Sequence, residues 1–169
     1  DAVYIATPHG THADLARQAL AAGKHVLCEK PLSLTRAEAA QLYALAEQRE
    51  VVLLEAIKTA FSPGFQRMVA VARSGSIGQV RSVDATFTKL VDAGRELEGP
   101  DGGAISELAS YPLAAVVKLL GTGYTDVTTT SLKPDGAEVD TFSRIDLTYP
   151  HAMASARVGL GVKAEGDLV

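Results

Sequence analysis

Glu29, Lys30 and Pro31 follow directly on an apolar segment, residues 25–28, whose composition is typical of a short buried strand. Ligands of open α/β sheets bind beyond the carboxyl ends of the strands, so this tripeptide would stand at a binding edge. A lysine that is partly removed from water there gives up its proton more readily, which suits proton transfer. Pro31 fixes the turn and permits a cis peptide bond. The spacing alone favours the plainer alternative, a charge pair exposed at the end of a strand.

A second polar segment, residues 7–12 with the sequence TPHGTH, occupies the equivalent end of the preceding strand-like segment, residues 3–6. Its backbone N–H groups, together with the N-terminus of the following helix, can meet the polar part of a nucleotide. His9 and His12 have the H-x-x-H spacing, but no third ligand is near in sequence, so a zinc site is not expected. We expect His12 to cap or to pack against the start of the helix.

Glu107 and Tyr111 stand four residues apart in a segment that is opened by Gly102 and Gly103. In a helix this spacing places both side chains on one face, where the carboxylate can orient the phenol and a nearby ammonium group would favour its ionised form. Pro112 predicts either a kink or a helix that restarts with proline in its first turn. The plainer alternative, a core helix with a half-buried tyrosine, is the one that spacing alone favours.

Three other features are not expected to carry a function. Residues 159–164 match the pattern G-x-G-x-x-A, but a dinucleotide fingerprint must open a helix, and these glycines lie in a strand-like segment. Cys28 ends an apolar segment and is expected in the core. The carboxylates Glu96, Glu98 and Asp101 belong to a loop without the regular ligand spacing of a cation site, so we expect no metal.

These groups need a scaffold, and residues 1–58 alternate strands with helices. One helix is expected from Thr11, as N-cap, to Ala22, and a second follows the capping box that Thr35 and Glu38 form. This alternation with short loops predicts a parallel sheet with right-handed crossovers. The expected strands are residues 3–6, 25–28 and 51–54.

Residues 59–169 show a different pattern. Alternating strands separated by turns predict a mostly antiparallel sheet with one polar or partner-facing side. The expected helices are 63–74 and 104–120, separated by a strand and a loop at 92–102, and the expected strands are 82–88, 126–132, 139–149 and 152–162.

The composition excludes several classes of function. The chain has 169 residues, of which 47% are hydrophobic, a formal net charge of −4, and Cys28 as its one cysteine. A mildly acidic chain without a Lys/Arg stripe is not expected to bind nucleic acid, and its apolar runs are too short to span a membrane. The single cysteine favours a reducing, cytoplasmic setting.

The first and last residues of the sequence predict that it is part of a longer protein. Asp1 opens directly on a strand-like segment, and residues 166–169 are typical of an interrupted strand or turn. We therefore expect an internal piece of a longer protein, inactive by itself, and the functional expectations concern that longer protein.

A linked set of motifs resembles one protein family. Ala6-Thr7-Pro8, His12 and residues 22–31, AGKHVLCEKP, resemble the Gfo/Idh/MocA family of NAD(P)-dependent oxidoreductases. The likeness is nearest to the branch of dimeric dihydrodiol dehydrogenase and sugar dehydrogenases. It continues through Glu55-Ala56, Phe61, Pro63, residues 75–80 and residues 102–121.

The resemblance implies an α/β fold in which residues 1–58 are the second half of a Rossmann dinucleotide-binding domain. Residues 59–169 would be a truncated α+β domain with a mostly antiparallel open sheet, which binds substrate and supports a homodimer or homotetramer through that sheet. The implied reaction is hydride transfer between NAD or NADP and a CH–OH group of a sugar, polyol or diol. The implied catalytic residues are Lys30, Tyr111 and Glu107, and the implied cofactor-binding residues are Thr7, Pro8, His9, His12, Glu29, Lys30 and Pro31.

Three positions depart from the family's pattern. Glu107 stands where Asp is common, Ala60 where Arg is expected, and Ala114 where Asp is common. An alternative therefore stays open, in which the protein is a non-catalytic relative that binds NAD(P) as a sensor or regulator. A plain α/β interaction domain is a third possibility, and it predicts no nucleotide affinity.

Overall fold

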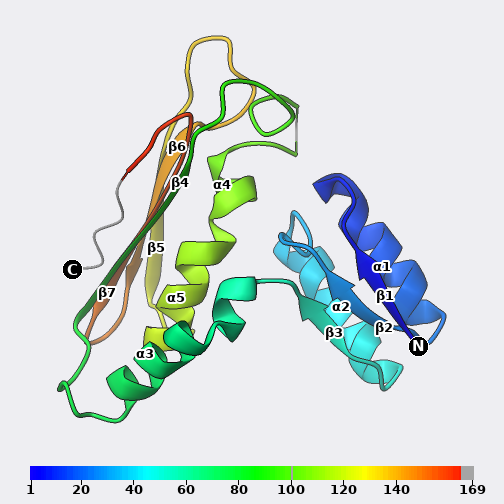
Figure 1. Ribbon diagram of the computed structural model, residues 1–169, viewed down its shortest axis with the longest axis horizontal. Coiled ribbons are helices and arrows are strands. Elements are labelled where there is room, and N and C mark those ends of the chain that lie inside the picture. Colours follow the sequence, from blue (N-terminus) through cyan, green and yellow to red (C-terminus); the bar gives the residue numbers. More distant parts are fainter. Residues whose placement is uncertain (100, 165–169) are drawn as a thin grey trace. The chain divides into compact units, whose positions relative to one another are not determined.

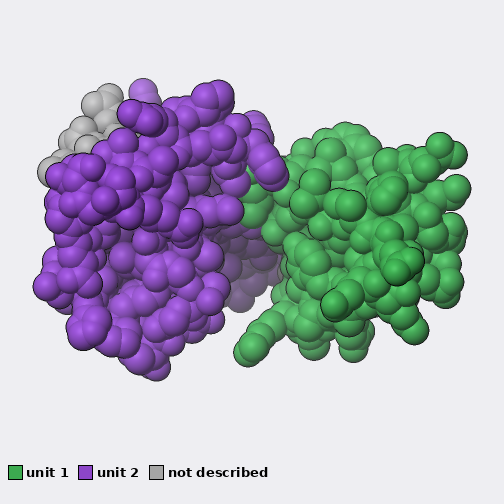
Figure 2. Space-filling model, turned by 90° about the horizontal axis from the view of Figure 1, so that it is seen from below, with its two compact units in different colours: residues 1–57 green, residues 58–169 purple. Residues whose placement is uncertain are grey.

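The computed structural model describes residues 1–99 and 101–164, so the strand or turn expected at 166–169 lies outside the described residues. The chain divides into two compact units, Asp1–Ile57 and Lys58–Val169, which Figure 2 colours separately. The boundary expected between residues 58 and 59 is one residue further along the chain. Each unit is described by itself.

The first unit is built on a three-stranded parallel sheet in the order β1-β2-β3 (Figure 1). Ile5 pairs with Cys28, and Cys28 pairs with Glu55, so the carboxyl ends of the three strands are level. The predicted parallel sheet is confirmed. The elements are β1 (Ala2–Ile5), η1 (His9–Thr11), α1 (His12–Ala21), β2 (His25–Cys28), α2 (Arg36–Gln48) and β3 (Leu53–Glu55).

Helices α1 and α2 pack against one face of this sheet. Val26 and Cys28 are buried under them, while Leu27 between the two is 40% exposed on the opposite face. The alternation follows from the two-residue period of a strand. The core of the unit consists of Ile5, Ala13, Ala16, Leu20, Val26, Cys28, Leu32, Leu42, Ala46 and Leu53.

The two helix starts differ from one another. The capping box is confirmed, because Thr35 Oγ1 accepts from Glu38 N–H at 3.2 Å and donates to Glu38 Oε2 at 2.9 Å. Thr11 stands at the expected N-cap position of α1, but its side chain makes no capping hydrogen bond. Thr11 has helical dihedral angles (φ −99°, ψ −14°) and ends the short 3-10 turn η1, so its hydroxyl turns back and donates to the Pro8 carbonyl at 2.7 Å.

The second unit has a four-stranded mixed sheet in the order β4-β7-β6-β5. The β4–β7 pair is parallel, while β7–β6 and β6–β5 are antiparallel, as expected for a mostly antiparallel sheet. The elements are η2 (Lys58–Phe61), α3 (Pro63–Arg73), β4 (Ser82–Lys89), α4 (Ala104–Leu108), α5 (Ser110–Leu120), β5 (Asp126–Leu132), β6 (Phe142–Thr148) and β7 (Met153–Leu160).

Helices α4 and α5 lie along one face of this sheet and bury its apolar side chains (Figure 1). The other face is polar and carries two ion pairs, Arg157 with Asp84 at 3.4 Å and Arg144 with Asp146 at 2.8 Å. The buried cluster consists of Val83, Ala104, Leu108, Ala109, Val116, Ile145, Leu147, Tyr149, Ala154, Ala156, Val158 and Leu160.

Gly159 lies inside β7 and not at the start of a helix, so the G-x-G-x-x-A pattern is not a dinucleotide fingerprint here. A Cβ atom at this position would lie 2.8 Å from Phe142 Cδ2 on the neighbouring strand. Glycine is present because the strand and its neighbour approach closely.

The helix expected over residues 104–120 is interrupted at Ala109, which separates α4 from α5. Pro112 has no N–H to donate to the Leu108 carbonyl, and this missing bond interrupts the helix. Ala109 keeps helical dihedral angles (φ −65°, ψ −24°). The restart with proline in the first turn, one of the two predicted outcomes, is therefore the one observed.

Within residues 1–99 and 101–164, none of the helices combines the length and the apolar composition that crossing a membrane requires.

Candidate active site

The carboxyl edge of the first unit's sheet brings the two polar segments of the sequence together. Residues 7–12 follow β1, and Glu29, Lys30 and Pro31 follow β2 directly. The Glu29 N–H donates to the Ile5 carbonyl at 2.8 Å, so the ladder continues to this residue. Because the strand ends are level, Lys30 lies at the carboxyl edge of the sheet, where the sequence predicts that a ligand binds.

Glu29 accepts a hydrogen bond from the Tyr4 hydroxyl at 2.7 Å. This bond to a carboxylate raises the pKa of the Tyr4 phenol. Lys30 is half-buried, and the Lys30–Pro31 peptide bond is cis. The Tyr4 side chain of β1 thus holds the Glu29 carboxylate at the sheet edge.

Glu55, the last residue of β3, is a candidate site residue to which the sequence motifs gave no role. It is half-buried, and its Oε1 accepts from the Leu32 N–H at 3.1 Å. Burial raises the pKa of the Glu55 carboxyl group, while the Leu32 N–H and the charges of Lys30 and His12 act in the opposite direction. The rule that selected Lys30, the carboxyl end of a parallel strand, would also have selected Glu55.

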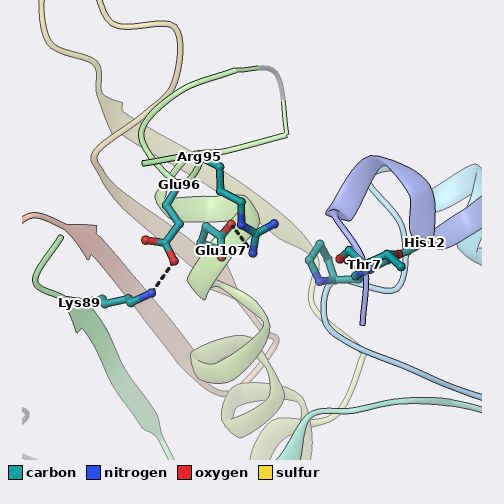
Figure 3. Close-up of polar contacts among 7 residues, drawn as sticks. Thr7, His12, Lys89, Arg95, Glu96 and Glu107 are labelled. Carbon is teal, nitrogen blue, oxygen red and sulfur yellow. Dashed lines mark hydrogen bonds and ion pairs between the residues drawn. The ribbon is translucent and has the colours of Figure 1, made fainter. Parts of the chain in front are cut away.

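His12 is fully buried at the start of α1, as its expected packing role requires. Its Nδ1 lies 2.8 Å from the Pro31 carbonyl oxygen and its Nε2 lies 2.8 Å from the Thr7 carbonyl oxygen (Figure 3 labels His12 and Thr7). His9, which is 4% exposed, packs edge-on at 5.6 Å between ring centroids. Burial disfavours a direct cofactor contact for both histidine side chains, since a ligand cannot reach a side chain without exposed surface.

Thr7 and Pro8 remain exposed in the loop after β1. The Thr7 and Thr11 hydroxyl oxygens are 2.6 Å apart, and Thr11 donates its proton to the Pro8 carbonyl. Thr7 therefore donates to Thr11, and the lone pairs of its own hydroxyl oxygen stay available as acceptors. These groups, at the N-terminus of the ten-residue helix α1, fit the polar part of a nucleotide.

In the second unit, Glu107 and Tyr111 keep their four-residue spacing across the interruption, because Ala109 stays helical. Glu107 is 5% exposed, and its Oε1 lies 4.0 Å from Arg95 Nη2. Figure 3 shows Arg95 pointing toward Glu107 and Lys89 forming an ion pair with Glu96, a member of the carboxylate loop. The carboxylate of Glu107 thus has a cationic partner that the sequence did not reveal.

Asp140 fixes the start of α4 and so the placement of Glu107. Its carbonyl accepts from the Ala104 N–H at 2.9 Å, and its Oδ2 accepts from the Ile105 N–H at 3.1 Å and from the Ser143 hydroxyl at 2.6 Å. The preceding Gly103 has φ 100°, and a Cβ there would lie 2.4 Å from Asp140 Oδ1. Asp140 is 35 residues from Ile105, so local spacing could not identify it.

A cavity of about 460 Å³ lies beside Tyr111 within the second unit. Its lining is mostly apolar with a few polar groups, which is typical of a small-molecule site. The lining residues include Thr59, Phe65, Met68, Asp84, Thr86, Phe87, Tyr111 and Pro112. Lys30 belongs to the first unit and Tyr111 to the second, so their convergence on one substrate oxygen stays a prediction.

In the part of the chain that the structure describes, no three or more His, Cys, Asp or Glu side chains are grouped so that they could hold a metal ion.

Comparison with known proteins identifies the family of both units. Residues 1–57 match the model of the oxidoreductase family with an NAD-binding Rossmann fold, and residues 65–167 match the GFO/IDH/MocA C-terminal domain. The predicted resemblance is therefore confirmed for both halves of the chain.

Two curated relatives illustrate the likeness. A dTDP-3,4-didehydro-2,6-dideoxy-alpha-D-glucose 3-reductase from Streptomyces violaceoruber is 40% identical over 124 residues, which are 72% of this chain and 36% of the relative. A D-xylose 1-dehydrogenase (NADP(+)) from Haloferax volcanii is 38% identical over 126 residues, 72% of this chain and 38% of the relative. The chain thus matches little more than a third of each relative's length.

A solved structure agrees with these relatives. The 3-ketoreductase KijD10 from Actinomadura kijaniata, in complex with TDP-benzene and NADP, superposes with a TM-score of 0.82 at 30% identity and covers 96% of this chain and 50% of the other. Fold, sequence and family models agree, and the chain belongs to the Gfo/Idh/MocA family of oxidoreductases, with an NAD-binding Rossmann fold in its first unit.

Proposed function

We propose that the full-length protein is an NAD(P)-dependent dehydrogenase that transfers a hydride between the nicotinamide and a CH–OH carbon of a sugar, polyol or diol. The observation that carries the proposal is the place of Lys30, half-buried at the carboxyl edge of a parallel sheet and beside Glu55 and His12. The names of the relatives support the substrate class, since they include a reductase of a dTDP-linked sugar and a xylose dehydrogenase.

Lys30 would donate to the substrate oxygen and take up or pass on its proton as the C–O bond gains or loses double-bond character. Tyr111 would share this proton transfer, and Glu107, held by Arg95, would orient Tyr111 or Lys30. In the direction of oxidation, the hydroxyl proton leaves to these groups and the hydride leaves the same carbon. The nicotinamide, when bound, supplies the acceptor or donor of the hydride.

Thr7, Pro8, Glu29, Lys30 and Pro31 would contact the cofactor. Thr7 and Pro8 are exposed beside the N-terminus of α1, where backbone donors suit phosphate groups. His9 and His12 would support these loops from beneath. The NADP named with the relatives favours NADP over NAD for this protein as well.

Turnover by the full-length protein tests the proposal. The protein is mixed with NAD⁺ or NADP⁺ and with D-xylose, D-glucose, glycerol or a vicinal diol, and in the reverse direction with the reduced cofactor and a keto sugar. We expect the absorbance of the reduced nicotinamide to rise in the first case and to fall in the second. Tight cofactor binding with unchanged absorbance across the panel would contradict the dehydrogenase and would favour the sensor or regulator instead.

The polar face of the second unit's sheet would join copies of the protein into a homodimer or homotetramer. This face carries charges of both signs, which a second copy of the same face can complement: Arg144 and Arg157 are positive, and Asp84 and Asp146 are negative. Met153 on the same face is 66% exposed. Light scattering of the full-length protein should give a multiple of the monomer mass. A charge reversal of both arginines, R144E with R157E, should reduce that mass, and an unchanged mass would place the interface elsewhere.

A further inference from the structure

Two side chains of the first unit contact the same peptide group, the one that links Pro31 to Leu32. His12 Nδ1 lies 2.8 Å from the Pro31 carbonyl oxygen, and Glu55 Oε1 accepts from the Leu32 N–H at 3.1 Å. The carbonyl and the N–H of one peptide bond point to opposite sides of a planar unit. The group is therefore held from both sides, by the start of α1 and by the end of β3.

The two contacts are complementary in their chemistry. A carbonyl oxygen only accepts, so a ring nitrogen that bonds to one must donate. Both ring nitrogens of His12 face carbonyl oxygens, those of Pro31 and Thr7, and a neutral ring can donate to one of them. The contact with Pro31 therefore requires that His12 carry a proton on Nδ1. Glu55 provides the acceptor that the N–H needs. His12 has no exposed surface and Leu32 is 4% exposed, so water cannot readily take the place of a lost partner, and the loss of either bond costs free energy.

The Pro31–Leu32 peptide group begins one residue after Lys30, so its orientation constrains the backbone of Pro31 and of Lys30 before it. Two hydrogen bonds on opposite edges prevent the planar unit from rotating about its Cα–Cα axis, which fixes ψ of Pro31. The pyrrolidine ring fixes φ of the same residue. With both dihedral angles of Pro31 set, the carbonyl end of Lys30 has a single orientation.

We propose that His12 and Glu55 are positioning residues for Lys30. They hold the Pro31–Leu32 peptide group in one orientation, His12 as hydrogen-bond donor to its carbonyl and Glu55 as acceptor from its N–H. The proposal rests on the proposed function in that Lys30 is taken as the group that meets the substrate oxygen. Glu55 has a second part in this arrangement, because its carboxylate lies close enough to Lys30 and His12 for their charges to lower its pKa against the effect of burial.

The substitutions that test this proposal differ in which bond they remove. E55A removes the acceptor of the Leu32 N–H, whereas E55Q keeps an amide oxygen in its place. H12Q removes the ring that reaches both carbonyls. H25Q is the matched control, since His25 also bonds to a backbone group of this unit, accepting from the Val52 N–H at 2.9 Å, but at the opposite end of β2.

Three measurements are made on the full-length protein with its cofactor. Hydrogen exchange of the Leu32 amide reports the hydrogen bond from its N–H to Glu55, and nuclear magnetic resonance reports the proton on His12 Nδ1. The rate at which Lys30 is acetylated, read by mass spectrometry, reports the placement of its amine without any need for turnover. Steady-state kinetics then separate kcat from cofactor binding.

We expect E55A to speed Leu32 exchange at least about tenfold and to lower kcat about 10- to 100-fold, with cofactor affinity within about threefold of wild type, because small displacements of a reacting group reduce rate more than binding. H12Q should lower kcat similarly. E55Q should restore kcat to within about threefold, and H25Q should leave kcat and Lys30 acetylation unchanged. A proton should be seen on His12 Nδ1.

Unchanged Leu32 exchange in E55A, or an unprotonated His12 Nδ1, would overturn the proposal, as would wild-type kcat and wild-type Lys30 acetylation in both E55A and H12Q. Failure of the proposed function has a different signature, because then the wild type turns over no substrate. In that case altered Lys30 acetylation in E55A and H12Q, but not in H25Q, still supports the positioning of Lys30, and unaltered acetylation overturns it.

Discussion

Phe87 of β4 and Tyr111 of α5 are stacked, with ring centroids 4.7 Å apart and ring planes inclined by 25°. The contact joins the sheet to the helix that carries the proposed acid–base group. Because a stacked ring cannot turn freely, Phe87 limits the directions in which the Tyr111 hydroxyl can point. Both rings also line the cavity of the second unit.

Tyr111→Phe should keep this stacking and remove only the hydroxyl. We expect kcat of the full-length protein to fall by roughly 10²-fold or more, as general acid–base groups contribute on this scale, while the thermal midpoint stays near that of wild type. Phe87→Leu is the complementary variant, and it should lower stability by about 0.5–1.5 kcal/mol through loss of the aromatic pair. Wild-type kcat in the Tyr111→Phe variant would remove the phenol from the reaction.

Lys30→Ala should lower kcat by roughly 10²–10⁴ while the cofactor still binds, because the lysine acts on the substrate oxygen. Stopped-flow turnover and a cofactor titration measure the two quantities separately. Lys24→Ala is the matched control, since Lys24 precedes β2 at the end of the strand opposite to Lys30. Equal activity of the two variants would show that Lys30 has no part in catalysis.

Gly103→Ala should destabilise the protein by about 1–3 kcal/mol, because a non-glycine residue at this φ is strained and its Cβ would meet Asp140 Oδ1. Asp140→Ala should have a similar cost through the loss of its bonds to Ile105 and Ser143. Urea unfolding measures both. Gly123→Ala, at a position with open space, is expected to cost little, and an equal loss in that variant would refute the specific role of the 103–140 contact.

Burial, with smaller effects of Glu55 and Glu29, raises the pKa of the Cys28 thiol from 9.0 to about 12. The folded protein therefore keeps the thiol protonated where the unfolded chain ionises it. This contribution to stability is complete below pH 9 and is lost as the pH rises from 9 toward 12. Unfolding free energies measured at several pH values in this window should fall less steeply for Cys28→Ala than for wild type, and parallel slopes would contradict the assignment.

Local sequence patterns determined most of the elements. The strand-like segments at 25–28 and 126–132 match β2 and β5 residue for residue, and the Thr35–Glu38 capping box starts α2 as predicted. These features depend on periodicity and on side chains three residues apart, which are readable along the chain. The edge location of Lys30 followed as well, since it needs only the order of strands.

The tertiary structure decided which groups surround the predicted residues. His12 contacts the carbonyl of Pro31, Glu55 contacts the Leu32 N–H, and Asp140 reaches α4, over sequence separations of 19, 23 and 35 residues. The register of the parallel sheet places the first two contacts at one edge, and no local pattern encodes that register. The Thr11 side chain makes no capping hydrogen bond for a related reason, because the 3-10 turn before α1 redirects its hydroxyl. A sequence specifies residue types and local periods, whereas the partners of a buried polar group depend on which distant backbone groups the fold brings within hydrogen-bond distance.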